Sequence, residues 1–113
     1  MNRTVTQKNF KEQVMQKRGL SIVQFFAEWS GTCQMMLPVY DELSNSYSSR
    51  ASFYSVNIDE EPALKEEYGI IELPTVLFFK NGNVIDFVAG VVSKNAFIAK
   101  LENTVAQLNN WTQ

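Results

Sequence analysis

The sequence predicts an α/β fold, a central mixed sheet of four to five strands flanked by helices on both faces. Three observations lead to this fold class. Short apolar runs rich in branched and aromatic residues alternate with longer runs of helical periodicity, and all of them fit within 113 residues. An Asn-Gly pair separates the last two strand-like runs. Alternating strands and helices favour parallel pairing, and the hairpin adds an antiparallel pair.

The first half of the chain predicts a helix, a strand and a second helix. Thr6 is a favoured capping residue for a first helix, which we expect to run to about Lys17. Residues 20–27 are a short apolar run, predicted as a buried strand. From Thr32 onward, apolar residues recur three and four positions apart, which predicts a helix that contains Pro38.

The second half predicts a strand, a short helix, a hairpin and a last helix. Residues 52–58 form the strand, and residues 63–68 form the short helix between a proline and a glycine. Residues 75–79 and 84–89 are the two arms of the Asn-Gly hairpin. Ser93 is the expected cap of the last, amphipathic helix.

Composition narrows the classes of function. With 45% hydrophobic residues, residues 1–113 are expected to form a single domain with its own core. The net charge is −2, without long runs of like charge, so we expect neither nucleic acid nor a membrane as a partner. The chain has no histidine, which the usual serine and cysteine hydrolases and most zinc sites need. We therefore expect no metal and no other cofactor.

The cysteine content predicts the compartment. Cys33 is the single cysteine of the chain, so no intramolecular disulfide can form. The first residues are polar and lack the continuous apolar run of a secretory signal. Both features favour a cytoplasmic location.

A series of short motifs, together with this layout, resembles the thioredoxin family over roughly Val5 to Val105. In chain order the motifs are Phe25-Phe26-Ala27-Glu28-Trp29, Gly31 and Cys33, Pro38, Asn57-Ile58-Asp59, Tyr68-Gly69-Ile70, Leu73-Pro74-Thr75, Phe79-Lys80-Asn81-Gly82, and Gly90. The resemblance implies the thioredoxin fold and, for partners, the thiols and disulfides of proteins or peptides, with glutathione as a further candidate.

The redox motif of this resemblance is a degenerate form of Cys-x-x-Cys. The chain reads Trp29-Ser30-Gly31-Thr32-Cys33, so the resemblance places Ser30 at the attacking-cysteine position and Cys33 at the resolving one. A hydroxyl forms no mixed disulfide, and without a neighbouring base it does not attack carbonyls. Serine is also among the best helix N-caps, and we expect Ser30 to have that structural role. The family's common proline is replaced by Thr32 at a variable position, from which nothing follows.

Two further positions depart from the family pattern. The resemblance places the family's buried acid, which helps to move protons, at Gln24, and the lysine beside it at Ser55. Gln24 is open to two interpretations: a sign that the dithiol cycle has been lost, or a buried amide that neighbouring polar groups satisfy.

Cys33 is likewise open to two interpretations. One turn inside the helix behind Trp29, it is expected to be shielded and to behave as an inert, small apolar residue. Alternatively, a local motion exposes Cys33, which then accepts glutathione or a partner thiol.

The motif Leu73-Pro74-Thr75 resembles the family's cis-proline loop. That resemblance implies that the backbone of Leu73 is offered to a bound peptide as a strand edge. An apolar patch beside it is expected from Trp29, Ile71, Leu73, Val91 and Val92, and for Val92 we favour core packing. Gly90 is expected to permit close approach.

Three functions are therefore open. The first is a role in thiol/disulfide redox homeostasis by binding protein or peptide partners, without ordinary dithiol–disulfide reductase activity. The second is a monothiol oxidoreductase that works through Cys33. The third is an engineered Cys-to-Ser variant of an active protein-disulfide reductase. Gln24 and Ser55 argue against this third function, because a single engineered change at Ser30 does not explain them.

Overall fold

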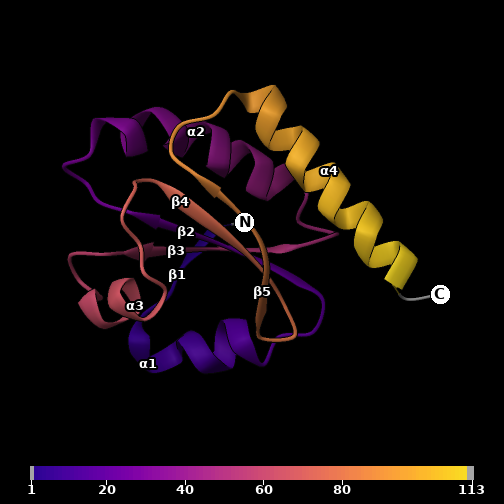
Figure 1. Ribbon diagram of the computed structural model, residues 1–113, viewed down its shortest axis with the longest axis horizontal. Helices are drawn as coiled ribbons and strands as arrows, with labels where there is room; N and C mark the ends of the chain where they lie inside the picture. Colours follow the sequence, from indigo (N-terminus) through magenta and orange to yellow (C-terminus); the bar gives the residue numbers. More distant parts are fainter. Residues whose placement is uncertain (1, 112–113) are drawn as a thin grey trace.

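The computed structural model describes residues 2–111, with side chains for residues 2–107. Figure 1 shows the arrangement of the helices and strands. In chain order they are β1 (Asn2–Thr4), α1 (Gln7–Phe10), the π-helical segment η1 (Lys11–Met15), β2 (Leu20–Phe26), α2 (Gly31–Ser46), β3 (Ser52–Asn57), α3 (Pro62–Glu67), β4 (Thr75–Lys80), β5 (Asn83–Ala89) and α4 (Lys94–Trp111).

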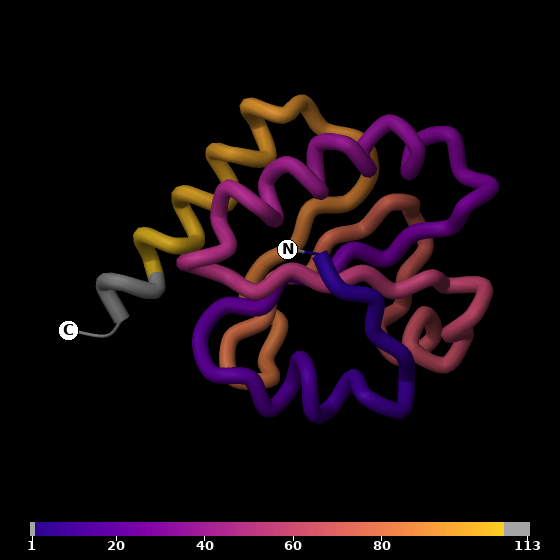
Figure 2. Tube along the Cα trace, turned by 180° about the vertical axis from the view of Figure 1, so that it is seen from behind, coloured from indigo at the N-terminus to yellow at the C-terminus, as the bar shows by residue number. Residues whose placement is uncertain are grey.

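The five strands form one mixed sheet in the order β1-β3-β2-β4-β5. The strands β1, β3 and β2 are parallel, whereas β4 runs antiparallel to β2, and β5 antiparallel to β4. The view from behind shows the indigo β1 along one edge of the sheet, beside β3 (Figure 2). The predicted α/β fold class, with its mixed sheet and the Asn-Gly hairpin, is confirmed.

Helices cover both faces of the sheet, as expected. The helices α2 and α4 lie on one face, and α1, η1 and α3 lie on the other (Figure 1). Alternation along β2 explains the two cores, because Ile22 points to the α2/α4 face and Val23 to the α1/α3 face. The α2/α4 core includes Leu20, Ile22, Met36, Tyr40, Leu43, Phe53, Val76, Phe78, Phe97 and Leu101. The α1/α3 core includes Val5, Phe10, Val14, Val23, Phe25, Tyr54, Val56, Leu64, Leu77 and Phe79.

The first helix is shorter and wider than expected. It ends at Met15 instead of Lys17, and its second half is a π-helical turn in which the Gln16 amide donates to the Lys11 carbonyl at 2.9 Å. A π turn holds more residues than an α turn, so Phe10, Val14 and Met15 all pack toward the same core. Residues spaced four and five apart therefore share one face here.

The first strand was not predicted from the sequence. Its three residues, Asn2, Arg3 and Thr4, are polar and show no alternation of apolar side chains. Pairing with β3 in a parallel register, with Arg3 opposite Tyr54, makes this segment a strand. Long-range backbone pairing therefore overrides the low strand propensity of these residues.

The last helix begins as predicted. Ser93 Oγ accepts a hydrogen bond from the Ala96 amide at 3.1 Å, which caps α4. Its apolar face buries Phe97 and Leu101, with Ile98 and Val105 packed beside them. The expected contribution of Leu108 to this face lies outside the described side chains.

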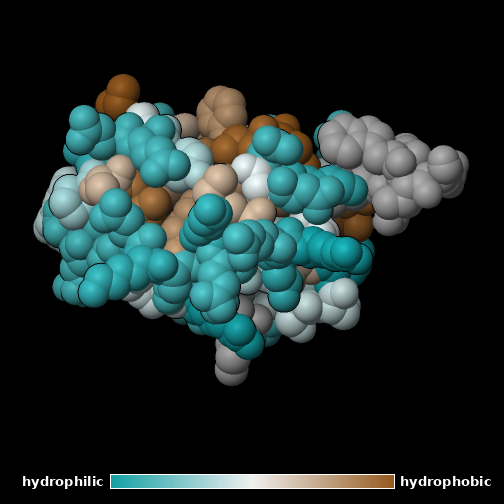
Figure 3. Space-filling view, turned by 90° about the horizontal axis from the view of Figure 1, so that it is seen from below, coloured by the Kyte–Doolittle hydropathy of each residue, from teal (hydrophilic) through white to brown (hydrophobic). Residues whose placement is uncertain are grey.

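The surface on the α1 side is mostly hydrophilic. Seen from below, hydrophobic residues gather along the edge at which β5 lies (Figure 3). On β5, Val84 and Phe87 are exposed. No helix within residues 2–111 is both long and apolar enough to cross a bilayer.

Candidate functional site

The site is built around the start of α2, where Ser30 is the N-cap. Ser30 has extended backbone angles, φ −85° and ψ 118°, and its Oγ accepts a hydrogen bond from the Cys33 amide at 3.3 Å. The first amides of a helix have no partner within the helix, and a serine hydroxyl satisfies one of them. The expected capping role of Ser30 is confirmed.

A short chain of hydrogen bonds joins this cap to the loop before β4. Thr32 Oγ1 donates to the Leu73 carbonyl at 2.7 Å. The same oxygen lies 2.8 Å from Ser30 Oγ. Because the single hydroxyl hydrogen of Thr32 is used on Leu73, Ser30 is the donor in the contact between the two hydroxyls. Ser30 thus both accepts and donates hydrogen bonds within the fold, and Thr32, from which the sequence led to no conclusion, bridges the two loops.

The Leu73–Pro74 peptide bond is cis, as the resemblance implies. The Gly90 amide donates to the Pro74 carbonyl at 2.7 Å, which brings the end of β5 against this loop. Gly90 has φ +82°, and a Cβ at this position would lie 2.5 Å from Glu72 Oε1. The positive φ therefore disfavours any side chain at Gly90, whereas the flexible end of Glu72 has freedom to move away. Thr75, directly after Pro74, donates its hydroxyl hydrogen to the Glu72 carbonyl.

Trp29 lies in the turn before α2 and is 70% exposed. Its indole Nε1 donates to Asp59 Oδ2 at 2.7 Å. Asp59 follows β3, and its amide donates to Asn57 Oδ1 at 3.0 Å. The hydrogen bond to Asp59 fixes the edge of the indole while its ring remains accessible. The sequence placed Asp59 in a family motif, but gave no indication of this contact.

The other members of the expected apolar patch differ in exposure. Ile71 is 94% exposed and Val91 is also exposed, whereas Leu73 is half-buried. Val92 packs against the α2/α4 core, which agrees with the core role favoured for it. Two hydrogen bonds, from Thr32 to Leu73 and from Gly90 to Pro74, connect the loops on which these apolar side chains lie.

Behind this surface, the thiol of Cys33 is free and fully buried, with 0% exposure. The expected shielding of Cys33 is confirmed. Cys33 is the third residue of α2, so its position in the first turn is close to the helix N-terminus.

Gln24 lies in β2, on the strand face that α2 covers, because it alternates in phase with Ile22. It is also 0% exposed, and neither Oε1 nor Nε2 has a hydrogen-bond partner among the described residues. The interpretation that neighbouring groups satisfy this amide is therefore wrong. The reason is its surroundings: its direct partner in the sheet, Ser55, uses its hydroxyl to donate to Asn2 Oδ1 at 2.8 Å.

The described residues include no group of three or more histidine, cysteine, aspartate or glutamate side chains placed together as metal ligands would be. The described site consists of the helix-capping Ser30, the buried thiol of Cys33 and exposed apolar side chains.

Sequence comparison connects this geometry to a known family. A family model described as Thioredoxin matches residues 2–103. The chain belongs to the thioredoxin family. The thioredoxin of Rickettsia bellii is 37% identical over 105 residues, which cover 93% of this chain and 100% of that protein. Thioredoxin 1 of Synechococcus elongatus is 38% identical over 98 residues, 87% of this chain and 92% of that protein. Thioredoxin 2 of Chlorobaculum tepidum is 35% identical over 100 residues, 88% of this chain and 92% of that protein.

This thioredoxin-family chain brings its sequence-predicted site residues together in two groups. At the start of α2, the buried Ser30 contacts Thr32, which donates a hydrogen bond to the Leu73 carbonyl. Beneath them, Gln24 and Ser55 are side by side on neighbouring strands. Gly31 begins α2 with open space around the position of a Cβ, so it makes no close contact that would require glycine.

Proposed function

We propose that this thioredoxin-family protein acts in thiol/disulfide redox homeostasis by binding protein or peptide partners, without ordinary dithiol–disulfide reductase activity. The observation that carries the proposal is the position of Ser30. It stands where the family pattern has the attacking cysteine, and its hydroxyl is used as the cap of α2 and as a donor to Thr32.

The chemistry of disulfide exchange supports the absence of dithiol turnover. A thiolate attacks one sulfur of the substrate, a mixed disulfide forms, and a second thiol resolves it. With Ser30 in the first position, no sulfur is available at the surface to form the mixed disulfide. Cys33 is too deeply buried to replace it in the observed conformation.

A binding role relies on groups that do not depend on a cysteine. Trp29, Ile71 and Val91 expose apolar surface, and hydrogen bonds hold their loops together around Leu73. The Leu73 carbonyl accepts from Thr32, but a carbonyl oxygen has two lone pairs and can accept from a peptide amide as well. An extended peptide that pairs with this backbone and packs on Trp29 is the partner that suits the surface best.

Binding is tested with the reduced and alkylated B chain of insulin, an extended polypeptide that cannot exchange disulfides. In a titration followed by amide chemical shifts, we expect the shift changes to concentrate at residues 29–33, 71–75 and 90–92. The Trp29→Ala variant should bind at least about tenfold more weakly, since aromatic anchors dominate many interfaces. Val84→Ala, which removes an exposed apolar side chain on β5, is the matched control and should bind normally. Equal binding by both variants would contradict the proposal.

A monothiol oxidoreductase that works through Cys33 is the second candidate, favoured by the place of this thiol in the first turn of α2. Helix N-termini stabilise thiolates, and an external thiol such as glutathione would then resolve the mixed disulfide. After incubation of the folded protein with oxidised glutathione, intact mass spectrometry decides between the candidates. An adduct on Cys33 supports the monothiol enzyme, whereas an adduct that forms only in denaturant rejects it.

Three further proposals accompany this function. We infer that residues 1–113 act as a single domain, since the described strands form one sheet. We place the protein in the cytoplasm, because its single thiol suits a reducing compartment. Ser30 is proposed to be natural, and the codon for residue 30 in the native gene distinguishes it from an engineered Cys-to-Ser change.

A further inference from the structure

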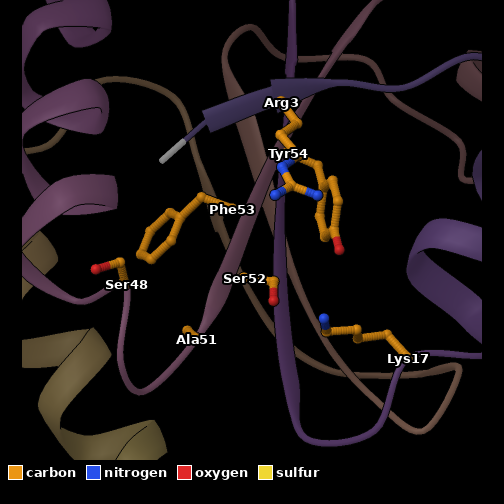
Figure 4. Close-up of a pocket in the computed structure, with 7 residues that line it drawn as sticks. All are labelled: Arg3, Lys17, Ser48, Ala51, Ser52, Phe53 and Tyr54. Atoms are coloured by element: carbon orange, nitrogen blue, oxygen red, sulfur yellow. The ribbon is translucent and has the colours of Figure 1, made fainter.

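A cavity lies at the opposite end of the sheet from Ser30. Its volume is about 160 Å³, and it opens where β1 meets the start of β3. Figure 4 shows its lining, which includes Arg3, Lys17, Ser48, Ser52 and Tyr54. We call it the Arg3 cavity. Since Ser30 follows the carboxyl end of β2 and this cavity lies at the amino end of β3, parallel to β2, the two sites are separate.

The Arg3 cavity brings together two exposed cations, Arg3 and Lys17. The guanidinium of Arg3, on β1, and the ammonium of Lys17, which precedes β2, both extend toward the hydroxyl of Ser52 (Figure 4). Neither cation makes an ion pair with another described residue, and the lining contains no acidic side chain. Two cations that approach one cavity repel each other, and a bound anion would offset this repulsion.

The donors and the size of the cavity specify the anion. Arginine presents a planar fork that matches two oxygens of a tetrahedral oxyanion, lysine adds a point charge, and serine adds one hydroxyl donor. A water molecule occupies about 30 Å³ in the liquid, so the cavity has room for about five waters. A phosphate group has the same number of non-hydrogen atoms. The hydroxyl of Tyr54 donates to the Gln13 carbonyl, so the ring of Tyr54 serves as a wall.

We propose that the Arg3 cavity is a phosphate-binding site, in which Arg3, Lys17 and Ser52 hold the oxygens of one phosphate group. The proposal does not depend on the function assigned to the Ser30 site. It uses residues from three distant parts of the chain, which the pairing of β1 with β3 brings together.

The test is a titration of the isotope-labelled full chain with inorganic phosphate at neutral pH, with sodium chloride added to keep the ionic strength constant. We expect saturable changes in the amide shifts around residues 3, 17 and 52–54. Arg3→Gln and Lys17→Gln should each weaken binding about tenfold, since a charge-assisted hydrogen bond is lost in each case. Lys65→Gln is the matched control: it removes one exposed cation on α3, at the other end of β3, and should not change the affinity.

Two outcomes would overturn the proposal. Amide shift changes that remain linear with phosphate concentration and spread over the surface would indicate only general ionic effects. Equal phosphate affinities of Arg3→Gln and Lys65→Gln would show that phosphate does not bind in the Arg3 cavity. O-phosphoserine in a parallel titration distinguishes the sources of the group. Binding as tight as that of inorganic phosphate supports a site for phosphate esters, and binding of inorganic phosphate alone supports a site for the free ion. Thermal unfolding of each variant confirms that it is folded.

Discussion

The hydroxyl of Ser30 has a structural role at the start of α2. The hydroxyl of Ser30 accepts from the Cys33 amide, and it donates to Thr32, which in turn donates to the Leu73 carbonyl. Each of these hydrogen bonds stabilises the junction between α2 and the loop before β4. Both hydrogen bonds of the Ser30 hydroxyl therefore lie within the fold.

The N-cap formed by Ser30 is expected to stabilise the fold. Ser30→Ala should lower the free energy of unfolding by about 1 kcal/mol, the usual cost of losing a helix N-cap. Urea denaturation measures the change. Ser46→Ala, at an exposed position near the end of the same helix, is the control and should stay within about 0.5 kcal/mol of the parent. If the two variants lose the same stability, the cap contributes nothing.

The amide of Gln24 supports a second prediction of the opposite sign. It is buried without a hydrogen-bond partner in the part of the chain that the structure describes, so it loses its hydration on folding without compensation. Gln24→Met, which keeps the unbranched shape, should therefore raise the free energy of unfolding by about 1 kcal/mol or more. A less stable variant in urea denaturation would show that the amide has a partner in solution.

Among the helices and strands, α2 is anchored to the sheet by Tyr40. Its ring is buried between the helix and the strands, and its hydroxyl approaches the Ile22 and Tyr54 carbonyls at 3.0 and 2.6 Å. One hydroxyl hydrogen thus bridges β2 and β3 beneath α2. Burial raises the pKa of Tyr40 well above its ordinary value. Burial, followed by the nearby charge of Glu67, raises the pKa of Tyr68 to about 12.

These shifts predict a loss of stability in alkali. Free tyrosines have a pKa of about 10, so above this pH the unfolded chain loses protons that the folded chain retains. The stabilisation is therefore complete below pH 10, and it declines as the pH rises from there toward the pKa values of the folded state. Urea unfolding between pH 8 and pH 11 measures this slope.

Tyr40→Phe is the matched variant for this experiment. It should be less stable by about 1 kcal/mol at neutral pH, since a hydrogen bond is lost, and it should lose less stability on further alkalinisation. A variant whose pH profile runs parallel to that of the parent would show that Tyr40 does not cause the alkaline decline.

For the molecule as a whole, the sequence predicted those parts of the fold whose signals are local. The apolar run of β2, the Asn-Gly hairpin and the caps at Ser30 and Ser93 each need only neighbouring residues to be recognised. The resemblance to the family motifs also predicted the cis peptide bond before Pro74.

The remaining features depend on contacts between distant residues. The strand β1 exists because Arg3 pairs opposite Tyr54, and its own polar sequence carries no strand signal. Thr32 contacts Leu73, which is 41 residues away along the chain. Among the described residues, the Gln24 amide has no hydrogen-bond partner, and the neighbouring Ser55 hydroxyl donates to Asn2, which is distant in sequence. The Arg3 cavity likewise needs three segments to meet.

We propose above that the surface around Trp29 and Leu73 binds partners without dithiol chemistry. The most direct measurement is insulin reduction with NADPH and thioredoxin reductase, comparing the parent with Ser30→Cys. We expect the parent to reduce insulin at the same rate as a blank without protein. We expect measurable turnover for Ser30→Cys, slowed because Gln24 cannot relay a proton. Insulin reduction by the parent above the blank would contradict the proposed lack of dithiol–disulfide reductase activity.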